Sequence, residues 1–216
     1  MCRYFLEPIN HTSMWDERYR EPEFAYGKEA NQFLQEHLDK LPPGKILFPC
    51  EGEGRNAVFA AQKGWEVAAF DGSREGFNKA SALAAEKLVA IQYQIGDASN
   101  IEYPVGSFDA IALIYAHFPI ETRQSLHQKF VTWLKPGGVI LLEAFHPSQL
   151  QNSSGGPKLS SMLLTPEILE DDFDTLETVL VDTATIVLDE GKYHQGKADV
   201  VRYVGIKQLI GGSRLG

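Results

Sequence analysis

The sequence predicts one α/β domain in which helices cover both faces of a doubly wound, mostly parallel sheet. Two patterns carry this prediction. Between residues 45 and 145, short runs of strand-forming residues alternate with amphipathic helical segments, as in consecutive β-α-β units. Further on, two β-rich stretches at 175–190 and 197–210 are separated only by GKYHQG. We therefore expect the sheet to end in an antiparallel hairpin at one edge.

The first elements alternate regularly along the chain. Residues 28–40 carry apolar side chains at helical spacing, and LPPG ends this helix. KILFP at 45–49 is a candidate for a short buried strand. Residues 54–63 predict a helix that packs small apolar side chains against the sheet, and the glycine that follows closes it. WEVAAFD at 65–71 is the second strand, and it ends in an acid.

The middle of the chain continues the alternation. Ser73 can cap a helix whose body, residues 77–88, is rich in helix-forming residues. VAIQYQIGD at 89–97 is the third strand, and FDAIALIYAHF at 108–118 is the fourth. The fourth strand is almost continuously apolar, as a central parallel strand should be. TRQSLHQKFVTWL predicts the next helix, and KPGG then turns the chain into a fifth strand, VILLEAF.

The last third of the chain differs in character. QNSSGGPKLSS at 151–161 has low complexity and predicts a mobile loop. A helix is expected at 165–173, before the hairpin. We expect a single domain over residues 1–216, organised as follows: an N-terminal lid and helix at 1–40, an α/β core at 41–210 and a frayed tail at 211–216.

The composition fits a globular protein with one core. The 216 residues are 44% hydrophobic and 23% charged, which is enough for a sizeable core. The net charge of -9 argues against a protein that binds nucleic-acid backbones, because such proteins normally show a basic face. With only Cys2 and Cys50 present, a disulfide framework is implausible. We find no signal-peptide core and no apolar run of membrane-spanning length, so we expect a soluble cytoplasmic protein without membrane or nucleic-acid partners.

Four residues mark a ligand site at one edge of the predicted sheet. In an open parallel sheet, ligands bind outside the carboxyl ends of the strands, near the switch in strand order. The loop EGEGRN lies there, and Gly52 and Gly54 let its backbone turn tightly and approach a ligand closely. Asp71 and Asp97 close the next two strands, where the first can accept from ribose hydroxyls and the second from an adenine amino group. The GxG alone is equally consistent with a plain turn, and the two acids favour a nucleotide-like cofactor.

The ordered set of motifs resembles the class I S-adenosylmethionine (SAM)-dependent methyltransferases. GEG, AFDGS, GDAS, FDAIALIYAH and LKPGGVILLEAF occur in the order and rough spacing of that family, over about residues 40–210. MWDERYREPEFAYGKEANQFL, EGEGRNAVFAA, EAFHPSQL, SSGGPK and EGKYHQGKADVV are similar to a bacterial branch near the tellurite-resistance and thiopurine methyltransferases. The resemblance implies a seven-stranded Rossmann-like sheet with a C-terminal antiparallel hairpin. It also implies SAM as cofactor and S-adenosylhomocysteine (SAH) as product.

The resemblance further implies a set of cofactor-binding residues. The glycine loop would line the methionine and ribose parts of SAM, Asp71 would bind the ribose hydroxyls, and Asp97 would read the adenine edge. Residues that leave the fourth strand would border the methionine and the methyl group, and three N-terminal aromatic residues would form a lid. The implied set is Cys50, Glu51, Gly52, Gly54, Asp71, Gly72, Ser73, Asp97, Ala98, Tyr115, Ala116, Trp15, Tyr19 and Tyr26.

The loop departs from the family pattern at two positions. Phe48 and Cys50 stand where the pattern has an acid and the first of three alternating glycines. We hypothesise that Glu51 supplies the missing carboxylate to the ammonium group of SAM; the alternative is a solvated loop residue. Arg55 could pair with a carboxylate such as that of SAM or face solvent, and Asn56 could hydrogen-bond at the start of the helix.

Methyl transfer requires few catalytic side chains, because the sulfonium of SAM already makes the methyl group electrophilic. The protein holds donor and acceptor in line, excludes water and, for some acceptors, removes a proton. The candidate bases are His117, His146, Tyr193 and His194, the first two at the ligand rim after the fourth and fifth strands. Each histidine could equally be a loop residue that caps backbone groups.

Other residues are expected to be structural. The remaining histidines, His127 among them, are expected on loop or helix surfaces, and no zinc-like spacing points to a metal site. Lys158 could steer an anionic acceptor or be ordinary surface. Trp65 and Trp133 are expected in the core.

These patterns predict an enzyme that transfers a methyl group from SAM to a small-molecule acceptor, aided mainly by positioning. Two alternatives stay open. An NAD-dependent oxidoreductase would also use glycines after its first strand and an acid after its second, but no complete GxGxxG is present. A non-catalytic SAM-binding domain would result if the altered loop does not support turnover. The branch resemblance favours an acceptor with a soft nucleophile such as a thiol or a selenium or tellurium oxyanion, and we expect a monomer or weak homodimer.

Overall fold

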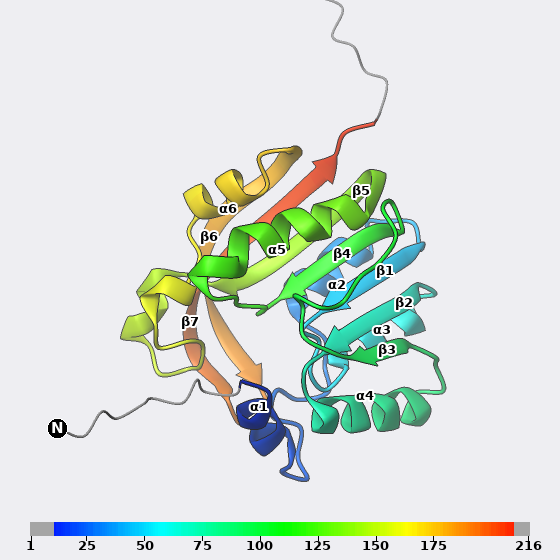
Figure 1. Ribbon diagram of the computed structural model, residues 1–216. Coiled ribbons are helices and arrows are strands. Elements are labelled where there is room, and N and C mark those ends of the chain that lie inside the picture. The colour runs from blue at the N-terminus through cyan, green and yellow to red at the C-terminus, as the bar shows by residue number, and fades with distance from the viewer. Residues whose placement is uncertain (1–10, 210–216) are drawn as a thin grey trace, which may run out of the picture.

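A computed structural model of the protein describes residues 11–209 (Figure 1). In this range the strands are β1 (Lys45–Pro49), β2 (Glu66–Asp71), β3 (Gln92–Ile95), β4 (Phe108–Ile114), β5 (Leu134–Phe145), β6 (Leu176–Glu190) and β7 (His194–Lys207). The helices are α1 (His11–Tyr19), α2 (Gln32–Leu38), α3 (Arg55–Gln62), α4 (Arg74–Glu86), α5 (Ile120–Trp133) and α6 (Pro166–Asp172), with short 3-10 turns η1 (Pro147–Gln151) and η2 (Ser160–Met162).

The strands form one seven-stranded sheet in the order β3-β2-β1-β4-β5-β7-β6. Strands β1 to β5 run parallel to one another, whereas β7 is antiparallel to both β5 and β6. The strand order reverses between β1 and β4, so the switch point lies at the loop that follows β1. The predicted fold, a doubly wound Rossmann-like sheet with a C-terminal antiparallel hairpin, is confirmed.

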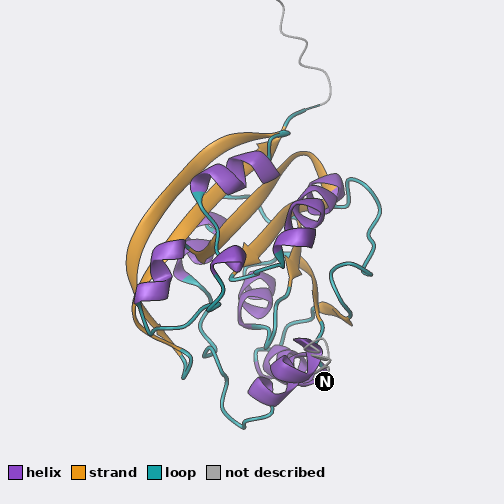
Figure 2. Ribbon diagram, turned by 60° about the vertical axis from the view of Figure 1, so that its left-hand side comes forward, coloured by secondary structure: helices purple, strands orange, loops and turns teal. Residues whose placement is uncertain are grey.

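Helices cover both faces of the sheet. In Figure 1, α5 and α6 lie in front of the strands and α2 and α3 behind them. Trp133 of α5 shares one buried cluster with Leu47 of β1, and Phe33 of α2 shares the other with Ile46 and Phe48. Neighbouring β1 residues belong to different clusters because successive side chains of a strand point to opposite faces. Figure 2 shows how strongly the sheet curves toward the β6–β7 edge.

Several predicted boundaries differ from the structure: the strand predicted at 89–97 covers only Gln92–Ile95, and the strand predicted at 108–118 ends at Ile114. KPGG belongs to β5: the pairing with β4 passes from Phe108–Leu134 to Ala110–Val139, so residues 135–138 bulge opposite a single β4 residue. The hairpin turn is shorter than GKYHQG, because β7 already begins at His194. The predicted tail at 211–216 lies outside the described residues, as do the first residues of the predicted lid.

The prediction that His127 lies on a helix surface is wrong. His127 of α5 is fully buried, and its Nδ1 lies 2.8 Å from Oδ2 of Asp172 on α6. Arg123 donates to the same carboxylate, with Nε 2.7 Å from Oδ2. Burial acts to raise the pKa of Asp172, but these two partners outweigh it and hold the pKa below its usual range. The cluster ties α5 to α6. Trp65 and Trp133 are buried, as predicted.

Candidate cofactor and acceptor site

The loop between β1 and α3 turns through three residues with positive φ. Cys50, Gly52 and Gly54 have φ of 55°, 65° and 89°. A Cβ on Gly54 would lie 2.6 Å from the Cβ of Ala80 in α4, so only glycine fits there. A Cβ on Gly52 would lie 2.6 Å from Oη of Tyr19. Cys50 keeps the left-handed backbone that a glycine would adopt without strain, so the loop retains its shape.

Phe48 shows why the usual acid cannot stand at its position here. It is 1% exposed and packs with Phe33 and Ile46 on the face that α2 and α3 cover. A carboxylate among these apolar side chains would lose its hydration without gaining a partner. The carboxylate nearest to Phe48 in sequence is that of Glu51, within the loop.

Glu51 caps helix α3. Its Oε1 accepts hydrogen bonds from the backbone N–H of Asn56 at 2.8 Å and of Ala57 at 2.7 Å. Gly54, the residue that precedes the helix, has no side chain to do so. Burial raises the pKa of Glu51 to about 7, although these N–H groups and the charge of Arg55 act to lower it. Because of this raised pKa, the carboxyl group of Glu51 changes its charge near neutral pH. The contact of Glu51 with the ammonium group of SAM stays a prediction.

Asp71 fixes the loop against the end of β2. Its Oδ2 accepts from the N–H of Gly52 at 3.1 Å, and its Oδ1 accepts from the N–H of Ser73 at 2.8 Å. Burial raises the pKa of Asp71 to about 6, against the lowering effect of the two N–H groups. The structure therefore brings together the glycine loop and the acid of the second strand, as the sequence predicts. Its contact with ribose hydroxyls stays a prediction.

The adenine side of the predicted site lies after β2 and β3. Ser73 caps α4 as predicted, with Oγ accepting from the N–H of Gly76 at 3.0 Å, and it donates to Asp16 of α1 at 2.5 Å. Asp97 is exposed and accepts from the N–H of Ser99 at 2.8 Å. The two remaining residues predicted here differ in exposure: Gly72 is half-buried, whereas Ala98 is buried.

Residues 20–31, which we call the strap, run from α1 to α2 and are anchored by a residue that the sequence prediction missed. Glu53 is 4% exposed, and its Oε2 accepts from the N–H of Ala25 at 2.8 Å. Its Oε1 forms an ion pair with Lys79 of α4 at 2.7 Å. No local pattern marks Glu53 as different from any other loop acid.

Arg55 and Asn56 also bind the strap, a contact that the sequence did not suggest for either of them. Arg55 does not face solvent: Nη1 donates to the carbonyls of Tyr26 and Glu29 at 3.2 Å each. Oδ1 of Asn56 accepts from the N–H of Asn31 at 3.0 Å, and the same side chain hydrogen-bonds Glu51 at the start of α3. Both side chains are buried, and both bind backbone groups that only the fold brings near.

The three aromatic residues of the predicted lid lie together. Trp15 stacks on Tyr19 with ring centroids 5.5 Å apart, and Tyr19 meets Tyr26 edge-on at 6.5 Å. Tyr19 is buried over the glycine loop, and burial raises its pKa well above the usual value. This placement fits a lid over the loop. Contact of the three rings with the cofactor stays a prediction.

A cluster of rings lies at the carboxyl end of β4; we call it the ring cluster. Its members are Tyr26, Tyr115, Phe145, Tyr193 and His194. His194 is central, with its ring 4.4 Å from that of Tyr26, 4.8 Å from Tyr115 and 5.4 Å from Phe145. Tyr115 has a φ of 54° and stacks on Phe145. Ala116 beside it is buried. The residues predicted to border the methyl group thus stand beside rings from the strap and the hairpin.

Glu143, which the sequence prediction did not single out, lies beneath the ring cluster. It is 1% exposed, and its Oε1 accepts from Nδ2 of Asn31 at 2.6 Å and from Oη of Tyr115 at 3.0 Å. Its Oε2 accepts from Nε of Arg202 at 2.7 Å. This acid in the apolar run VILLEAF is the sequence signal that could have identified it, since a lone charge in a buried strand needs partners.

Both ring nitrogens of His117 have backbone partners. Nδ1 lies 2.8 Å from the carbonyl oxygen of Met162, so it carries a proton, and Nε2 accepts from the N–H of Phe145 at 3.4 Å. Burial lowers the pKa of His117 to about 4. Of the two roles left open, the capping role is the one that this geometry supports; a role as general base would require the contact with Phe145 to break.

His146 is not brought to the ring cluster. Its Nδ1 lies 2.9 Å from Oγ of Ser148 and caps η1. It borders a separate polar cavity of about 150 Å³ whose other lining residues include Thr183, Thr185 and Asp199. Lys158 is exposed on its loop.

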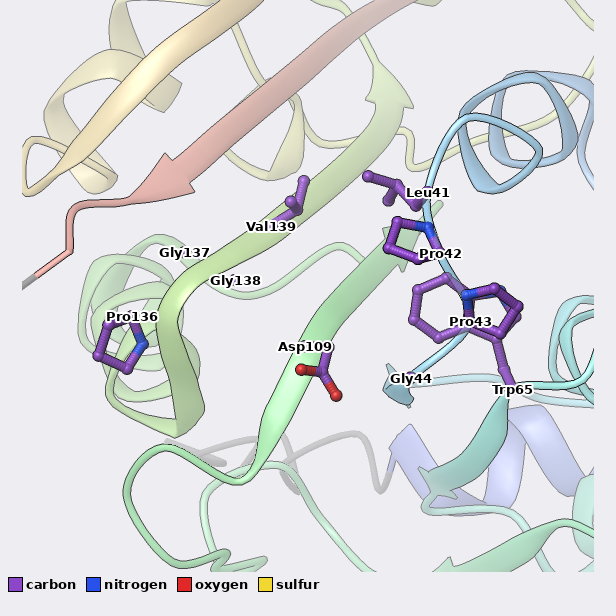
Figure 3. Close-up of a pocket in the computed structure, with 10 residues that line it drawn as sticks. All are labelled: Leu41, Pro42, Pro43, Gly44, Trp65, Asp109, Pro136, Gly137, Gly138 and Val139. Carbon is purple, nitrogen blue, oxygen red and sulfur yellow. The ribbon is translucent and has the colours of Figure 1, made fainter.

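A larger cavity opens at the opposite end of the strands (Figure 3). It measures about 240 Å³ and is lined by Leu41, Pro42, Pro43, Gly44, Trp65, Asp109, Pro136, Gly137, Gly138 and Val139. These residues stand before β1 and β2 and at the starts of β4 and β5, so the cavity lies away from the glycine loop. Among residues 11–209, no cluster of histidine, cysteine and acidic side chains could hold a metal ion.

Comparison with known proteins identifies a domain family. Residues 46–138 match the family described as "Methyltransferase domain". Phosphoethanolamine N-methyltransferase 3 of Arabidopsis thaliana is 27% identical over 117 residues, which cover 54% of this chain and 24% of the plant protein. A 2-heptyl-1-hydroxyquinolin-4(1H)-one methyltransferase of Mycobacteroides abscessus is 23% identical over 139 residues, 63% of this chain and 61% of that protein. The chain thus spans about a quarter of the length of the plant relative.

Solved structures share the fold over most of the chain. A structure from a study of disulfide-to-thioacetal conversion in echinomycin biosynthesis has a TM-score of 0.73 at 15% identity and covers 94% of both chains. TehB from Haemophilus influenzae has a TM-score of 0.68 at 17% identity, covering 83% of this chain and 63% of its own. A SAM-dependent methyltransferase from Methanosarcina mazei has a TM-score of 0.66 at 16% identity, covering 84% and 99%. At these identities the likeness supports the fold, and the tellurite-resistance branch stays a prediction.

Proposed function

This chain belongs to the class I SAM-dependent methyltransferases, and on that premise we propose that it transfers a methyl group from SAM to a small-molecule acceptor. The observation that carries the proposal is the joint placement of Gly52 and Asp71 at the switch point of the sheet. Asp71 holds the backbone of the loop there. We assign to this carboxylate the binding of the two vicinal hydroxyls of the ribose.

The donor set of the site suits SAM. The pKa of Glu51 lies near neutrality, so a ligand ammonium placed beside it would favour its ionised form. The rings of Tyr26 and Tyr115 present π faces and edges at the end of β4, where a sulfonium methyl can be held by attraction between the cation and the rings. When bound, SAM supplies an electrophilic methyl group, and the protein's part is to place it.

Placement is the main work assigned to the protein's residues. The strap and the ring cluster exclude water, and alignment of donor and acceptor can lower the barrier by roughly 7–11 kcal/mol. In the geometry described, His117 and His194 are engaged by other groups, with Nδ1 of His194 lying 3.1 Å from Glu190. We therefore propose a direct in-line displacement by an acceptor that attacks as an anion and has already given its proton to water, so that no side chain has to remove a proton before attack.

The acceptor is proposed to be a small molecule with a soft nucleophile, such as a thiol or a selenium or tellurium oxyanion, following the branch resemblance. The named relatives are methyltransferases of small compounds, which agrees with this class. In residues 11–209, no helix is long and apolar enough to cross a membrane. A monomer or weak homodimer in the cytoplasm, acting without a nucleic-acid partner, completes the proposal.

A non-catalytic SAM-binding domain is the second candidate, favoured by the replacement of the usual loop acid with the buried Phe48. Titration calorimetry with SAM, SAH and NAD tests the first step: we expect SAM and SAH to bind and NAD not to. A screen of thiols, chalcogen oxyanions and phenols with labelled SAM then tests transfer. Absence of SAM binding would refute both candidates, whereas binding without transfer to any acceptor would favour the non-catalytic one.

A further inference from the structure

The tip of the β6–β7 hairpin, residues 190–194, is hydrogen-bonded to the end of the glycine loop through one side chain. Arg55 is the residue directly after Gly54, and its Nη2 donates to Oε2 of Glu190 at 2.9 Å. We propose that Arg55 is a positioning residue for the acceptor side of the site, by which we mean the ring cluster at the end of β4. Through Glu190, Arg55 holds the hairpin tip and with it the ring of His194. The proposal rests on the function proposed above and assigns a role to a part of the chain far from the glycine loop in sequence.

The ion pair is buried. The side chain of Arg55 is 8% exposed and that of Glu190 is 17% exposed. Two charges removed from water need several partners each to be stable. Arg55 has its carboxylate and the strap carbonyls of Tyr26 and Glu29, and Glu190 also lies 3.1 Å from Nδ1 of His194. Because all these groups satisfy one another, the position of the tip depends on Arg55.

The tip packs directly on the backbone of the strap. A Cβ on Gly191 would lie 2.5 Å from the nitrogen of Gly27 and 2.7 Å from the carbonyl oxygen of Ala25. The N–H of Tyr193 donates to the same carbonyl at 3.2 Å. Strap and tip therefore fit together only while both keep these backbone contacts. Arg55 is bonded to both segments at once.

His194 links this contact to the acceptor side. It follows the turn as the first residue of β7, and its ring fills the centre of the ring cluster between Tyr26 and Tyr115. A displacement of the tip would move this ring and so change the wall that faces the end of β4. Arg55 thus connects the loop, the strap and the tip, and a ligand that orders the loop should also order the tip.

Hydrogen–deuterium exchange of the full chain, with and without saturating SAH, tests this coupling. In the wild type we expect SAH to slow exchange both in the strap and in peptides that cover residues 188–196. In Glu190→Gln the strap should keep its SAH protection, and the tip should lose most of its own. Without ligand, exchange at the tip of this variant should be faster by roughly tenfold, the effect of losing a hydrogen bond to a charged group.

Lys192→Gln is the matched control. Lys192 pairs with Glu21 at 2.7 Å on the same tip, but both side chains are exposed, at 59% and 41%. Surface pairs of this kind contribute little, so we expect wild-type exchange. An acceptor found in the screen adds a second measurement: Glu190→Gln should raise KM for the acceptor at least fivefold and leave KM for SAM within twofold.

Two results would overturn the proposal. The first is that Glu190→Gln leaves hydrogen–deuterium exchange at the tip as slow as in the wild type. The second is that Glu190→Gln raises KM for SAM and not KM for the acceptor. Failure of the proposed function has a different signature, because the wild type would then not bind SAH in calorimetry. In that case the exchange of the free protein still decides whether Arg55 and Glu190 hold the tip.

Discussion

Binding of SAH near neutral pH should release protons from the protein, and Glu51 should be the main source. Glu51 holds one carboxylate oxygen against the start of α3, and burial raises its pKa to about 7. A ligand ammonium beside this group would favour its ionised form and lower its pKa. The proton held by Glu51 in the free protein would then leave as the ligand binds.

The expected number of protons follows from the two raised pKa values in the site. At pH 7 a group with a pKa of about 7 binds about 0.5 proton, and one with a pKa of about 6, such as Asp71, binds about 0.1. Release of about half a proton at pH 7 therefore requires Glu51. The number of protons that Glu51 releases should rise to about 0.8 at pH 6.5 and fall to about 0.1 at pH 8.

The sign of the stability effect is fixed by the same shift. Because its folded-state pKa is above its usual value of 4.5, the folded protein binds this proton more tightly than the unfolded chain does. The contribution of Glu51 to stability is therefore greatest below pH 4.5 and is lost as the pH rises to about 7. A cationic ligand offsets this loss, so stabilisation by SAH should be larger at pH 7.5 than at pH 5.5.

Titration calorimetry in buffers of different ionisation enthalpy measures the protons directly. Glu51→Gln, which keeps one oxygen for the helix cap, should reduce the release at pH 7 to about 0.1 proton and weaken SAH binding by roughly tenfold. Glu66→Gln, which changes an exposed acid at the start of β2, is the matched control and should behave as the wild type. An unchanged release in Glu51→Gln would refute the assignment of the ammonium to Glu51.

Three further predictions concern single side chains. Gly54→Ala should destabilise the protein in urea by at least about 2 kcal/mol more than Gly64→Ala, because both have φ near +90° but only Gly54 lacks room for a Cβ; equal losses would contradict this. Asp172→Asn should cost about 3–5 kcal/mol, since a partly buried arginine and a buried histidine lose their shared carboxylate, whereas the exposed Asp171→Asn should cost below about 0.5 kcal/mol. Asp71→Asn should weaken SAH binding at least about tenfold in calorimetry at pH 8, because an amide cannot accept from two N–H groups and the ribose as a carboxylate does; unchanged affinity would remove Asp71 from the site.

Much of the fold follows from local pattern. The alternation of short apolar runs with helical segments predicted the parallel strands, and Ser73 predicted the start of α4. These features depend on residues within a few positions of one another, so a single sequence contains them. The same holds for the glycine loop, whose turn is set by the backbone freedom of Gly52 and Gly54. The wrong boundary at KPGG arose because its pairing partner lies in β4.

The partners of buried charges could not be predicted in this way. His127 was misplaced because α6, which covers it, is a separate helix whose carboxylate is 45 residues away. Glu143 and Glu53 were missed because their partners come from the strap and from other elements. In each case the sequence shows a charge but not what surrounds it, and the cost of burying a charge depends entirely on its surroundings.

The sequence by itself determined the architecture and the place of the cofactor loop, because periodicity and glycine positions act locally. The tertiary structure alone decided what EGEGRN does beyond its glycines. Glu51 caps a helix, while Glu53, Arg55 and Asn56 bind a strap that precedes them by some 25 to 30 residues. Arg55 also reaches Glu190, 135 residues further along the chain. Hydrogen bonds over such separations form only after the sheet has brought its loops to one edge, so no local pattern in the sequence encodes them.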